Sequence, residues 1–147
     1  MNHETCDQLV AGYAQILRPK LFLGRYRYPD VSVDAFISRL ASEAAVQKVS
    51  YALTGGPAAD LLHQNYRDIE VPVFIAATDP TTLRGLRLMP ARNGPVMLLK
   101  AFGKLVYWRE VKHQFVAPPW LIYAELLTSR DPRAREVAEE LRRGFLQ

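Results

Sequence analysis

Cysteine is almost missing from this sequence, and its scarcity excludes two kinds of small protein. Cys6 is the single cysteine among 147 residues, so the chain has no internal disulfide framework and no cysteine-cluster zinc site. The three histidines, His3, His63 and His113, are scattered without the spacing of metal ligands. We therefore predict no metal centre, and no Ser-His-Asp or Cys-His catalytic group.

Long hydrophobic runs are also missing. No apolar segment approaches the roughly 20 residues that a membrane helix needs. The first residues, MNHET, lack the basic and then apolar pattern of a signal peptide. These features predict a cytoplasmic protein with no membrane partner. The net charge of +4 at pH 7 permits a nucleic-acid or acidic partner without requiring one.

The pattern of apolar residues predicts an α/β (α+β) fold in which a mixed sheet is flanked by helices. A length of 147 residues with 49% hydrophobic residues suits a single domain over 1–147. We divide it into an N-terminal helix and strand (5–30), a helix (32–48) and a core of alternating strands and helices (49–147). Within that core we expect a β-hairpin around Gly103, formed by residues 96–111.

Local signals predict several helix boundaries. The first helix should stop at Pro19, because proline lacks the N–H group that a helix interior uses. Ser32 is expected to cap a helix over 33–47. Asp79 and Asp131 each precede a proline, which combines a capping side chain with the residue favoured at the first helical position.

The stretch YALTGGPAADLLHQNYRDIEVPVFIAA, residues 51–77, has the order of elements that nucleotidyltransferases use. An apolar run leads to the Gly55-Gly56 turn, where backbone amides at a helix N-terminus can approach a phosphate. A second apolar run follows Asp68 and Glu70. On a strand these two side chains would point the same way, and two carboxylates can share a Mg²⁺ ion.

Two interpretations of this stretch stay open. For an active enzyme, Glu110 in YWREVKH is the candidate third carboxylate, and Mg²⁺ would be required. Against activity, Pro57 removes an amide from the turn, and Glu70 replaces the usual second Asp. The structural alternative is a simple strand-to-helix turn with Asp68 and Glu70 at a solvated strand entrance. We favour the interpretation without catalysis and without a cofactor.

Basic and aromatic residues alternate in a second stretch, LRPKLFLGRYRY, part of which should form a strand over 20–30. The candidate nucleic-acid or partner-binding residues are Arg18, Lys20, Arg25, Tyr26 and Arg27. Such a mixture combines phosphate contact with base stacking. A strand with apolar side chains inward and arginines in solvent gives the same alternation, and we favour that simpler explanation.

Three segments, taken in order, resemble the C-terminal region of bacterial AbiEi-type antitoxins of type IV toxin–antitoxin systems. They are LRPKLFLGRYRYPD, YALTGGPAADLL and FVAPPWLIYAELLTSRDPRAREVAEELRRGFL. In that family a helix and an LRP…LLLGRFR strand precede a TGG.AA turn, and the chain closes with APP…Y.ELL…DPR…A..L. The resemblance spans about residues 9–146.

The resemblance implies a nucleotidyltransferase-like scaffold that has lost catalysis, and no catalytic residue is carried over. It also implies a role in countering a toxin that is encoded beside this chain and is itself of the nucleotidyltransferase type. That relation can be functional or physical. Family members usually carry an N-terminal winged-helix domain that binds DNA. Only a few residues precede residue 9, so we expect this module to be absent here.

Overall fold

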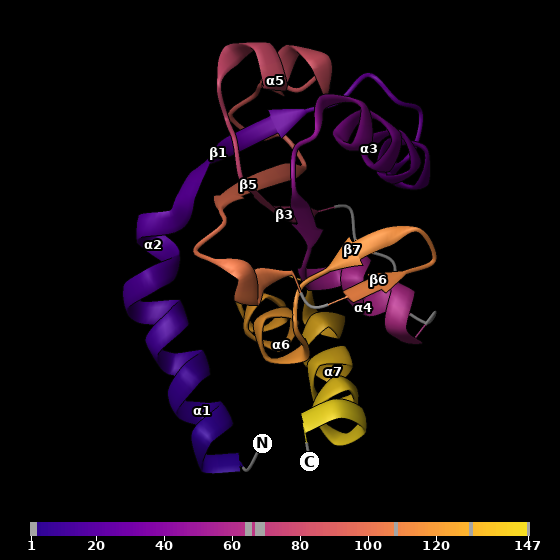
Figure 1. The fold of residues 1–147 in the computed structure, drawn as a ribbon. Helices are drawn as coiled ribbons and strands as arrows, with labels where there is room; N and C mark the ends of the chain where they lie inside the picture. Colours follow the sequence, from indigo (N-terminus) through magenta and orange to yellow (C-terminus); the bar gives the residue numbers. More distant parts are fainter. Residues whose placement is uncertain (1–2, 64–65, 67–69, 108, 130, 147) are drawn as a thin grey trace.

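The structure is a computed structural model that describes residues 3–63, 66, 70–107, 109–129 and 131–146. It is a mixed α/β fold, as predicted, with a seven-stranded sheet flanked by helices (Figure 1). The strands are β1 (Phe22–Arg27), β2 (Tyr51–Leu53), β3 (Val71–Ile75), β4 (Met89–Pro90), β5 (Val96–Lys100), β6 (Arg109–Val111) and β7 (Gln114–Val116).

Helical segments make up much of the rest of the described chain. They are α1 (His3–Gly12), the π-helical turn η1 (Tyr13–Leu17), α2 (Arg18–Leu21), α3 (Val33–Gln47), α4 (Gly55–His63), α5 (Pro80–Gly85), the 3-10 turn η2 (Lys104–Val106), α6 (Pro119–Thr128), α7 (Pro132–Leu141) and the π-helical turn η3 (Arg142–Leu146). None of the described helices is long and apolar enough to cross a membrane.

The strand order in the sheet is β4-β1-β5-β3-β2-β7-β6. Strands β3 and β5 run parallel, as do β2 and β7, whereas the other neighbouring pairs are antiparallel. The predicted N-terminal strand therefore lies inside the same sheet as the strands of the predicted core. Every residue of β3 is buried, as expected for a strand with neighbours on both edges and helices nearby.

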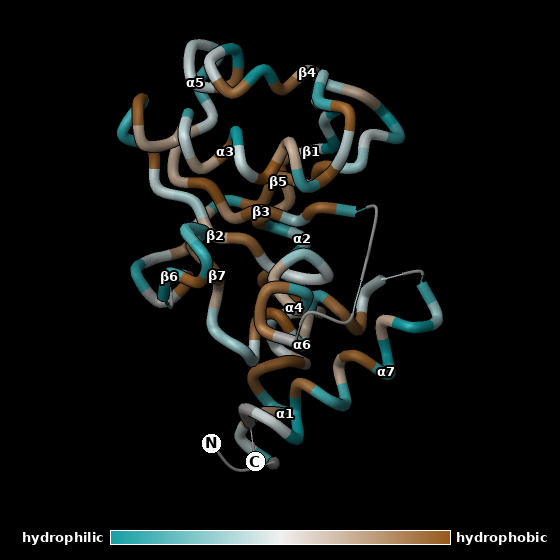
Figure 2. Tube along the Cα trace, turned by 90° about the vertical axis from the view of Figure 1, so that its right-hand side faces the viewer, coloured by the Kyte–Doolittle hydropathy of each residue, from teal (hydrophilic) through white to brown (hydrophobic). Residues whose placement is uncertain are grey.

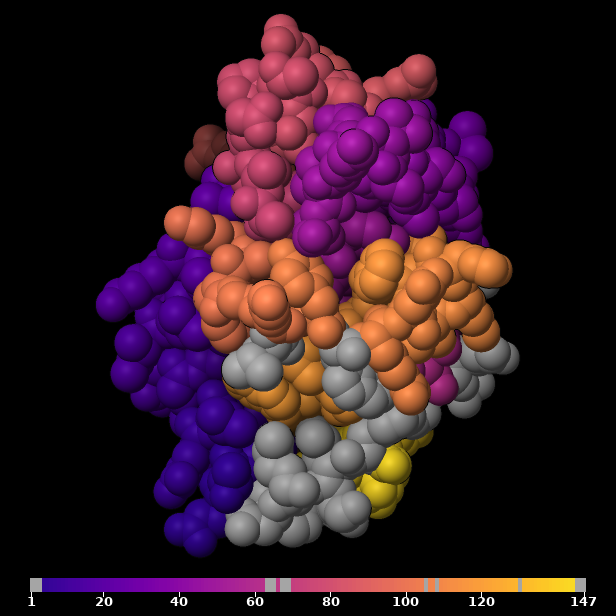
Figure 3. Space-filling model, in the orientation of Figure 1, coloured from indigo at the N-terminus to yellow at the C-terminus, as the bar shows by residue number. Residues whose placement is uncertain are grey.

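The helices form two groups around the sheet. Helices α3 and α5 pack together near β1 and β5, and α4, α6 and α7 pack together at the other end (Figure 1). The α1–η1–α2 segment lies along one side of the molecule, away from the β6–β7 segment (Figure 3). Hydrophobic segments gather in β3, β5 and α6 between these layers (Figure 2). Cys6 of α1 is fully buried in the hydrophobic core, which fits a packing residue.

The predicted helix starts are confirmed. Ser32 accepts a hydrogen bond from the Ala35 amide at 3.1 Å and begins α3. Asp79 and Asp131 do the same for α5 and α7, each one residue ahead of the proline that opens the helix. In each case an oxygen of the capping side chain satisfies an amide that has no partner within the helix.

The first helical segment continues beyond its predicted end. Pro19 does not stop it, because η1 interrupts the regular hydrogen bonding and leaves Pro19 in the first turn of α2. A proline is tolerated in a first turn, where its N–H would have no helical partner. The helical path therefore reaches Leu21, and the strand that follows is shorter than the predicted 20–30.

The predicted hairpin around Gly103 is wrong. Strand β5 pairs with β1 and β3, while β6 pairs with β7. Four of the five residues of β5 are buried, so this strand needs a neighbour on each edge rather than one hairpin partner. After Gly103, at φ +124°, the chain enters the η2 turn and leaves β5 behind.

Candidate functional site

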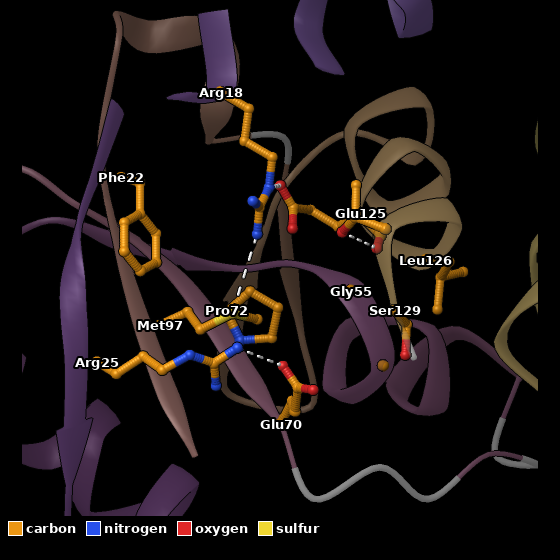
Figure 4. Close-up of a pocket in the computed structure, with 12 residues that line it drawn as sticks. Arg18, Phe22, Arg25, Gly55, Glu70, Pro72, Met97, Glu125, Leu126 and Ser129 are labelled. Carbon is orange, nitrogen blue, oxygen red and sulfur yellow. Dashed lines mark hydrogen bonds and ion pairs between the residues drawn. The ribbon is translucent and has the colours of Figure 1, made fainter. Parts of the chain in front are cut away.

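A pocket of about 270 Å³ lies between the sheet and helices α2, α4 and α6 (Figure 4). We call it the arginine–glutamate pocket, because two residues of each kind line it. Its lining consists of Arg18, Phe22, Arg25, Gly55, Gly56, Glu70, Pro72, Met97, Glu125, Leu126, Thr128 and Ser129. The two stretches that sequence analysis treated separately therefore meet in one place.

The sheet register places Arg25 in this pocket. Arg25 of β1 pairs with Met97 of β5, which in turn pairs with Pro72 of β3, so the three side chains form a row across the sheet. The Arg25 guanidinium donates to the Gly94 carbonyl at 3.1 Å and lies 3.3 Å from a Glu70 carboxylate oxygen. Both members of this ion pair keep partial contact with solvent.

Glu125 of α6 is the most buried charged group of the pocket. Its side chain has no exposed surface, and its Oε1 accepts hydrogen bonds from the Tyr13 hydroxyl at 2.5 Å and from Arg18 Nε at 2.8 Å. Its Oε2 is buried and has no hydrogen-bond partner among the described residues. One carboxylate thus holds the N-terminal helical segment against α6 and keeps one oxygen uncommitted.

The π-helical turn η1 explains why Tyr13 and Arg18 reach the same carboxylate. Residues five apart lie about 140° apart around a regular α-helix, so they face different sides. A π-helical turn bonds residues five apart instead, which brings them close to the same face. Tyr13 opens η1 and Arg18 follows its last residue, so both side chains point toward Glu125.

Gly55 is required where α4 begins beside the pocket. Its φ is +63°, a left-handed value that side chains disfavour, and a methyl group there would lie 2.6 Å from Pro72 Cγ. The Cβ atom of Glu125 lies 3.6 Å from the same position. Glycine therefore lets the helix start pack closely against β3 and α6. It also places the first amides of α4 at the pocket, where a helix carries partial positive charge.

Electrostatics favour the charged form of Arg18 and the neutral form of Tyr13. Burial and the charge of Glu125 raise the pKa of the Tyr13 phenol far above its usual range, so it stays a hydrogen-bond donor. Burial is the largest single influence and would lower the pKa of Arg18, but the hydrogen bond to Glu125 and the nearby negative charges together outweigh it and raise the pKa. Arg18 therefore stays charged where it contacts Glu125.

The structure brings together some of the residues predicted as a nucleotidyltransferase site and separates others. Gly55, Gly56 and Glu70 line the pocket, although α4 begins at Gly55 rather than after a separate turn, and Glu70 precedes β3. Glu110 is exposed on β6, the edge strand at the far end of the sheet from β1, and it does not line the pocket. Asp68 lies outside the described residues.

The candidate nucleic-acid or partner-binding residues of the second stretch are also separated in the structure. Arg18 and Arg25 turn into the pocket, where each pairs with a carboxylate. Lys20 is exposed on α2 rather than on the predicted strand, and Tyr26 is half-buried in β1. Arg27, at the end of β1, belongs to a different surface.

That second surface is a basic groove of about 690 Å³ along the edge of the sheet. It is lined by Arg27, Tyr28, Pro29, Arg84, Arg87, Leu88 and Met89. The three arginines are exposed, and none of the described lining residues is acidic. The Tyr28 ring stacks on the Phe36 ring with 4.5 Å between the ring centroids. One face of the Tyr28 ring is therefore covered by the protein and cannot stack on a nucleobase.

Sequence reasoning missed Glu125, which lines the pocket, and Tyr13, which donates a hydrogen bond to it. A signal for Glu125 was present, because it is the one charged residue in the α6 sequence PWLIYAELLT. A lone carboxylate in an apolar helix must find partners when the helix is buried. Tyr13 gave no comparable signal, since its partner is 112 residues away in the sequence.

The acidic side chains of the pocket are engaged by other residues of the pocket. Both of its carboxylates, Glu70 and Glu125, already pair with arginines. Within the described ranges, no three histidine, cysteine or acidic side chains gather as a cation would need. The fold and pocket therefore define a mixed α/β protein with a small, charged and preorganised pocket.

Comparison with known families identifies the chain more closely. The model of a family described as "transcriptional regulator, AbiEi antitoxin, type IV TA system" matches residues 2–146. The chain therefore belongs to the AbiEi antitoxin family of type IV toxin–antitoxin systems. No curated protein and no solved structure matches it.

Proposed function

We propose that this chain is a non-enzymatic antitoxin of a bacterial type IV toxin–antitoxin system, acting in the cytoplasm. The observation that carries the proposal is the AbiEi family match over residues 2–146, nearly the whole chain. Its counterpart is a toxin encoded beside it, which we propose to be of the nucleotidyltransferase type. Antagonism of that toxin can be functional, without a stable complex between the two proteins.

The placement of the acidic residues supports the absence of catalysis. Metal-dependent phosphoryl transfer needs carboxylates that converge on a shared cation. Glu70 instead lies 3.3 Å from the Arg25 guanidinium, and Glu110 lies on β6, the edge strand three positions from β3 in the sheet. The Gly55-Gly56 helix start after β2, with Glu70 ahead of β3, supports a nucleotidyltransferase-like scaffold from which Mg²⁺ chemistry has been lost.

Growth rescue tests this function directly. The chain is co-expressed with the gene encoded beside it, and colony growth is compared with expression of the toxin alone. We expect the wild-type chain to restore growth, and Asp68→Ala and Glu110→Ala to restore it equally well. No rescue by the wild type contradicts the antitoxin assignment. Rescue that both substitutions abolish would favour an active, metal-dependent enzyme instead.

Nucleic-acid binding is a second candidate function, and the basic groove supports it. Arg27, Arg84 and Arg87 are exposed around an acid-free floor, a charge distribution suited to phosphates. Arg87 adopts φ +57°, a left-handed conformation in which glycine is more usual. A residue other than glycine in this sparsely populated conformation supports a functional role for its side chain.

The salt dependence of binding tests this second function. DNA and RNA duplexes are titrated against the chain at several salt concentrations. If the groove contacts phosphates, affinity falls steeply with salt, and Arg84→Ala lowers the slope by about 1. Lys20→Ala, which removes an exposed charge on α2 away from the groove, should leave the slope nearly unchanged. Equal effects of the two substitutions would contradict a groove-specific interface.

A further inference from the structure

The arginine–glutamate pocket contains an acceptor that none of the described residues satisfies. Glu125 is 2% exposed, and its Oε2 has no hydrogen-bond partner in the described part of the chain. Figure 4 shows the Glu125 side chain extending from α6, with its carboxylate beside the Arg18 guanidinium. A buried carboxylate oxygen is costly unless a donor reaches it, so this atom favours a ligand with a hydroxyl or amine group.

The pocket also offers donors to an anion. The nine-residue helix α4 begins at Gly55 and Gly56, which line the pocket with the positive end of the helix. The Arg25 guanidinium, 29% exposed, lies on the facing strand and is held in place by the Gly94 carbonyl. Its ion-pair distance of 3.3 Å to Glu70 is long for a charge-assisted hydrogen bond, which leaves room for a stronger anionic partner.

An aromatic ring completes the lining. Phe22, at the start of β1, is 41% exposed and lines the pocket opposite Gly55 (Figure 4). Met97 lies between them on β5 and adds a polarizable thioether. A flat heterocycle can stack on such a wall, because every nucleobase has a π face that an aromatic ring can cover. A simple amino acid or inorganic anion would leave this wall unused.

We propose that this pocket binds a nucleoside monophosphate. The base stacks on Phe22, a ribose hydroxyl or base amine donates to Glu125 Oε2, and the phosphate lies between Arg25 and the start of α4. One phosphate is favoured over three because Arg18 is committed to Glu125. The volume of about 270 Å³ is also slightly below the range of roughly 300–1,000 Å³ that is usual for ligand pockets. No metal is required, since the charges are supplied by the protein.

Calorimetric titration tests the ligand class. AMP, GMP, CMP and UMP are titrated into the purified chain in EDTA, with adenosine and inorganic phosphate as the two halves of the ligand. We expect saturable 1:1 binding of at least one nucleotide, at least about tenfold tighter than either half, or 1.4 kcal/mol. Inorganic phosphate binding as tightly as the nucleotides overturns the proposal. Absence of saturable nucleotide binding at millimolar concentration also overturns it.

Matched variants test the location. Arg25→Gln should weaken nucleotide binding about tenfold, whereas Arg27→Gln, the same charge change on the same strand, should change it less than about twofold. Phe22→Leu should weaken it, whereas Phe115→Leu, on an aromatic residue of similar exposure in β7, should not. Equal losses within either pair would indicate general surface effects and overturn the assignment.

Glu125→Gln provides the most direct test of the unpartnered oxygen. It keeps the side-chain shape, and nucleotide binding should fall while circular dichroism stays native. If this variant does not fold, the Arg25 and Phe22 pairs decide the question. Nucleotide binding goes beyond the proposed antitoxin function, and it is measured on the purified chain without any toxin. A variant that loses nucleotide binding but still rescues growth, or a variant that does the reverse, separates nucleotide binding from the antitoxin function.

Discussion

Arg25 and Arg27 lie two residues apart in β1, yet their guanidinium groups have opposite surroundings. Arg25 enters the arginine–glutamate pocket, where it contacts Glu70 and the Gly94 carbonyl. Arg27 is exposed in the basic groove together with Arg84 and Arg87. Among the described residues, none of these three groove arginines forms an ion pair, whereas both pocket arginines do.

This contrast separates charges that are preorganised from charges that are free to meet a partner. A buried charge must be paired, and its partners fix its position before any ligand arrives. An exposed arginine needs no protein partner and remains hydrated and mobile. Binding at the groove should therefore weaken strongly with salt, whereas binding in the pocket should be less sensitive because its charges are shielded from counter-ions.

The largest loss of stability should come from removing the buried carboxylate of the pocket, Glu125. Glu125→Ala removes the acceptor shared by Tyr13 and Arg18 and leaves the Arg18 charge largely buried. We expect a loss of about 3 kcal/mol in the free energy of unfolding, measured by urea denaturation, since Arg18 keeps some solvent contact. Glu110→Ala, at an exposed glutamate, should stay within about 0.5 kcal/mol. Similar losses for both substitutions would show that the contacts of Glu125 with Tyr13 and Arg18 do not stabilise the fold.

A smaller effect is expected from the hydroxyl that donates to this carboxylate. Tyr13→Phe removes a hydrogen bond to a charged acceptor and should cost about 2 kcal/mol. Tyr51→Phe is the matched control, because the buried Tyr51 hydroxyl donates to the neutral Gln114 amide at 2.8 Å. Its cost should be about 1 kcal/mol. A larger loss for Tyr51→Phe would contradict an ionic acceptor at Glu125.

The features that could be predicted from the sequence are local. Ser32, Asp79 and Asp131 cap helices because their side chains bond amides two or three residues away, a pattern visible in the sequence. The apolar run of β3 likewise indicates a buried strand. Family resemblance added the antitoxin assignment, because three short segments in the right order carry information that no single motif does.

The pocket could not be predicted because it depends on partners distant in the sequence. Glu125 meets Tyr13 and Arg18 across more than 100 residues, and only through a π-helical turn that regular helical periodicity does not anticipate. Glu110 was grouped with Glu70 because strand order is not legible from strand composition. The wrong hairpin around Gly103 has the same cause, since β5 finds its neighbours in β1 and β3.

The partly exposed pair in the pocket should contribute less to stability than the buried one. Arg25→Gln removes an ion pair whose members keep 29% and 23% exposure. We expect a loss of about 0.5–1 kcal/mol in unfolding free energy, and a change near zero for Arg27→Gln, which loses no ion pair. Denaturation at low and high salt measures both. A loss for Arg27→Gln equal to that for Arg25→Gln would remove the distinction between the two environments.

The smallest expected effect is a gain in the free energy of unfolding, from glycine substitutions at two left-handed residues, one inside the basic groove and one outside it. Arg87 and Lys48 each follow a helix in the left-handed conformation, at φ +57° and +56°. In both places the residue's own amide and the amide of the following residue bond back to carbonyls of the last turn, an arrangement in which glycine is favoured. Replacing either residue by glycine relieves roughly 1–2 kcal/mol of strain. The added freedom of the unfolded chain offsets roughly 0.4–1 kcal/mol of that.

Arg87→Gly and Lys48→Gly should therefore both raise the unfolding free energy, by about 0.5 kcal/mol. They should differ in binding, because Arg87 lines the basic groove and Lys48 does not. We expect Arg87→Gly to weaken duplex binding and lower its salt slope by about 1, and Lys48→Gly to change neither. A protein that becomes more stable while it binds less would show that the Arg87 side chain serves binding at the expense of stability. Unchanged binding by Arg87→Gly would contradict the groove as a nucleic-acid interface.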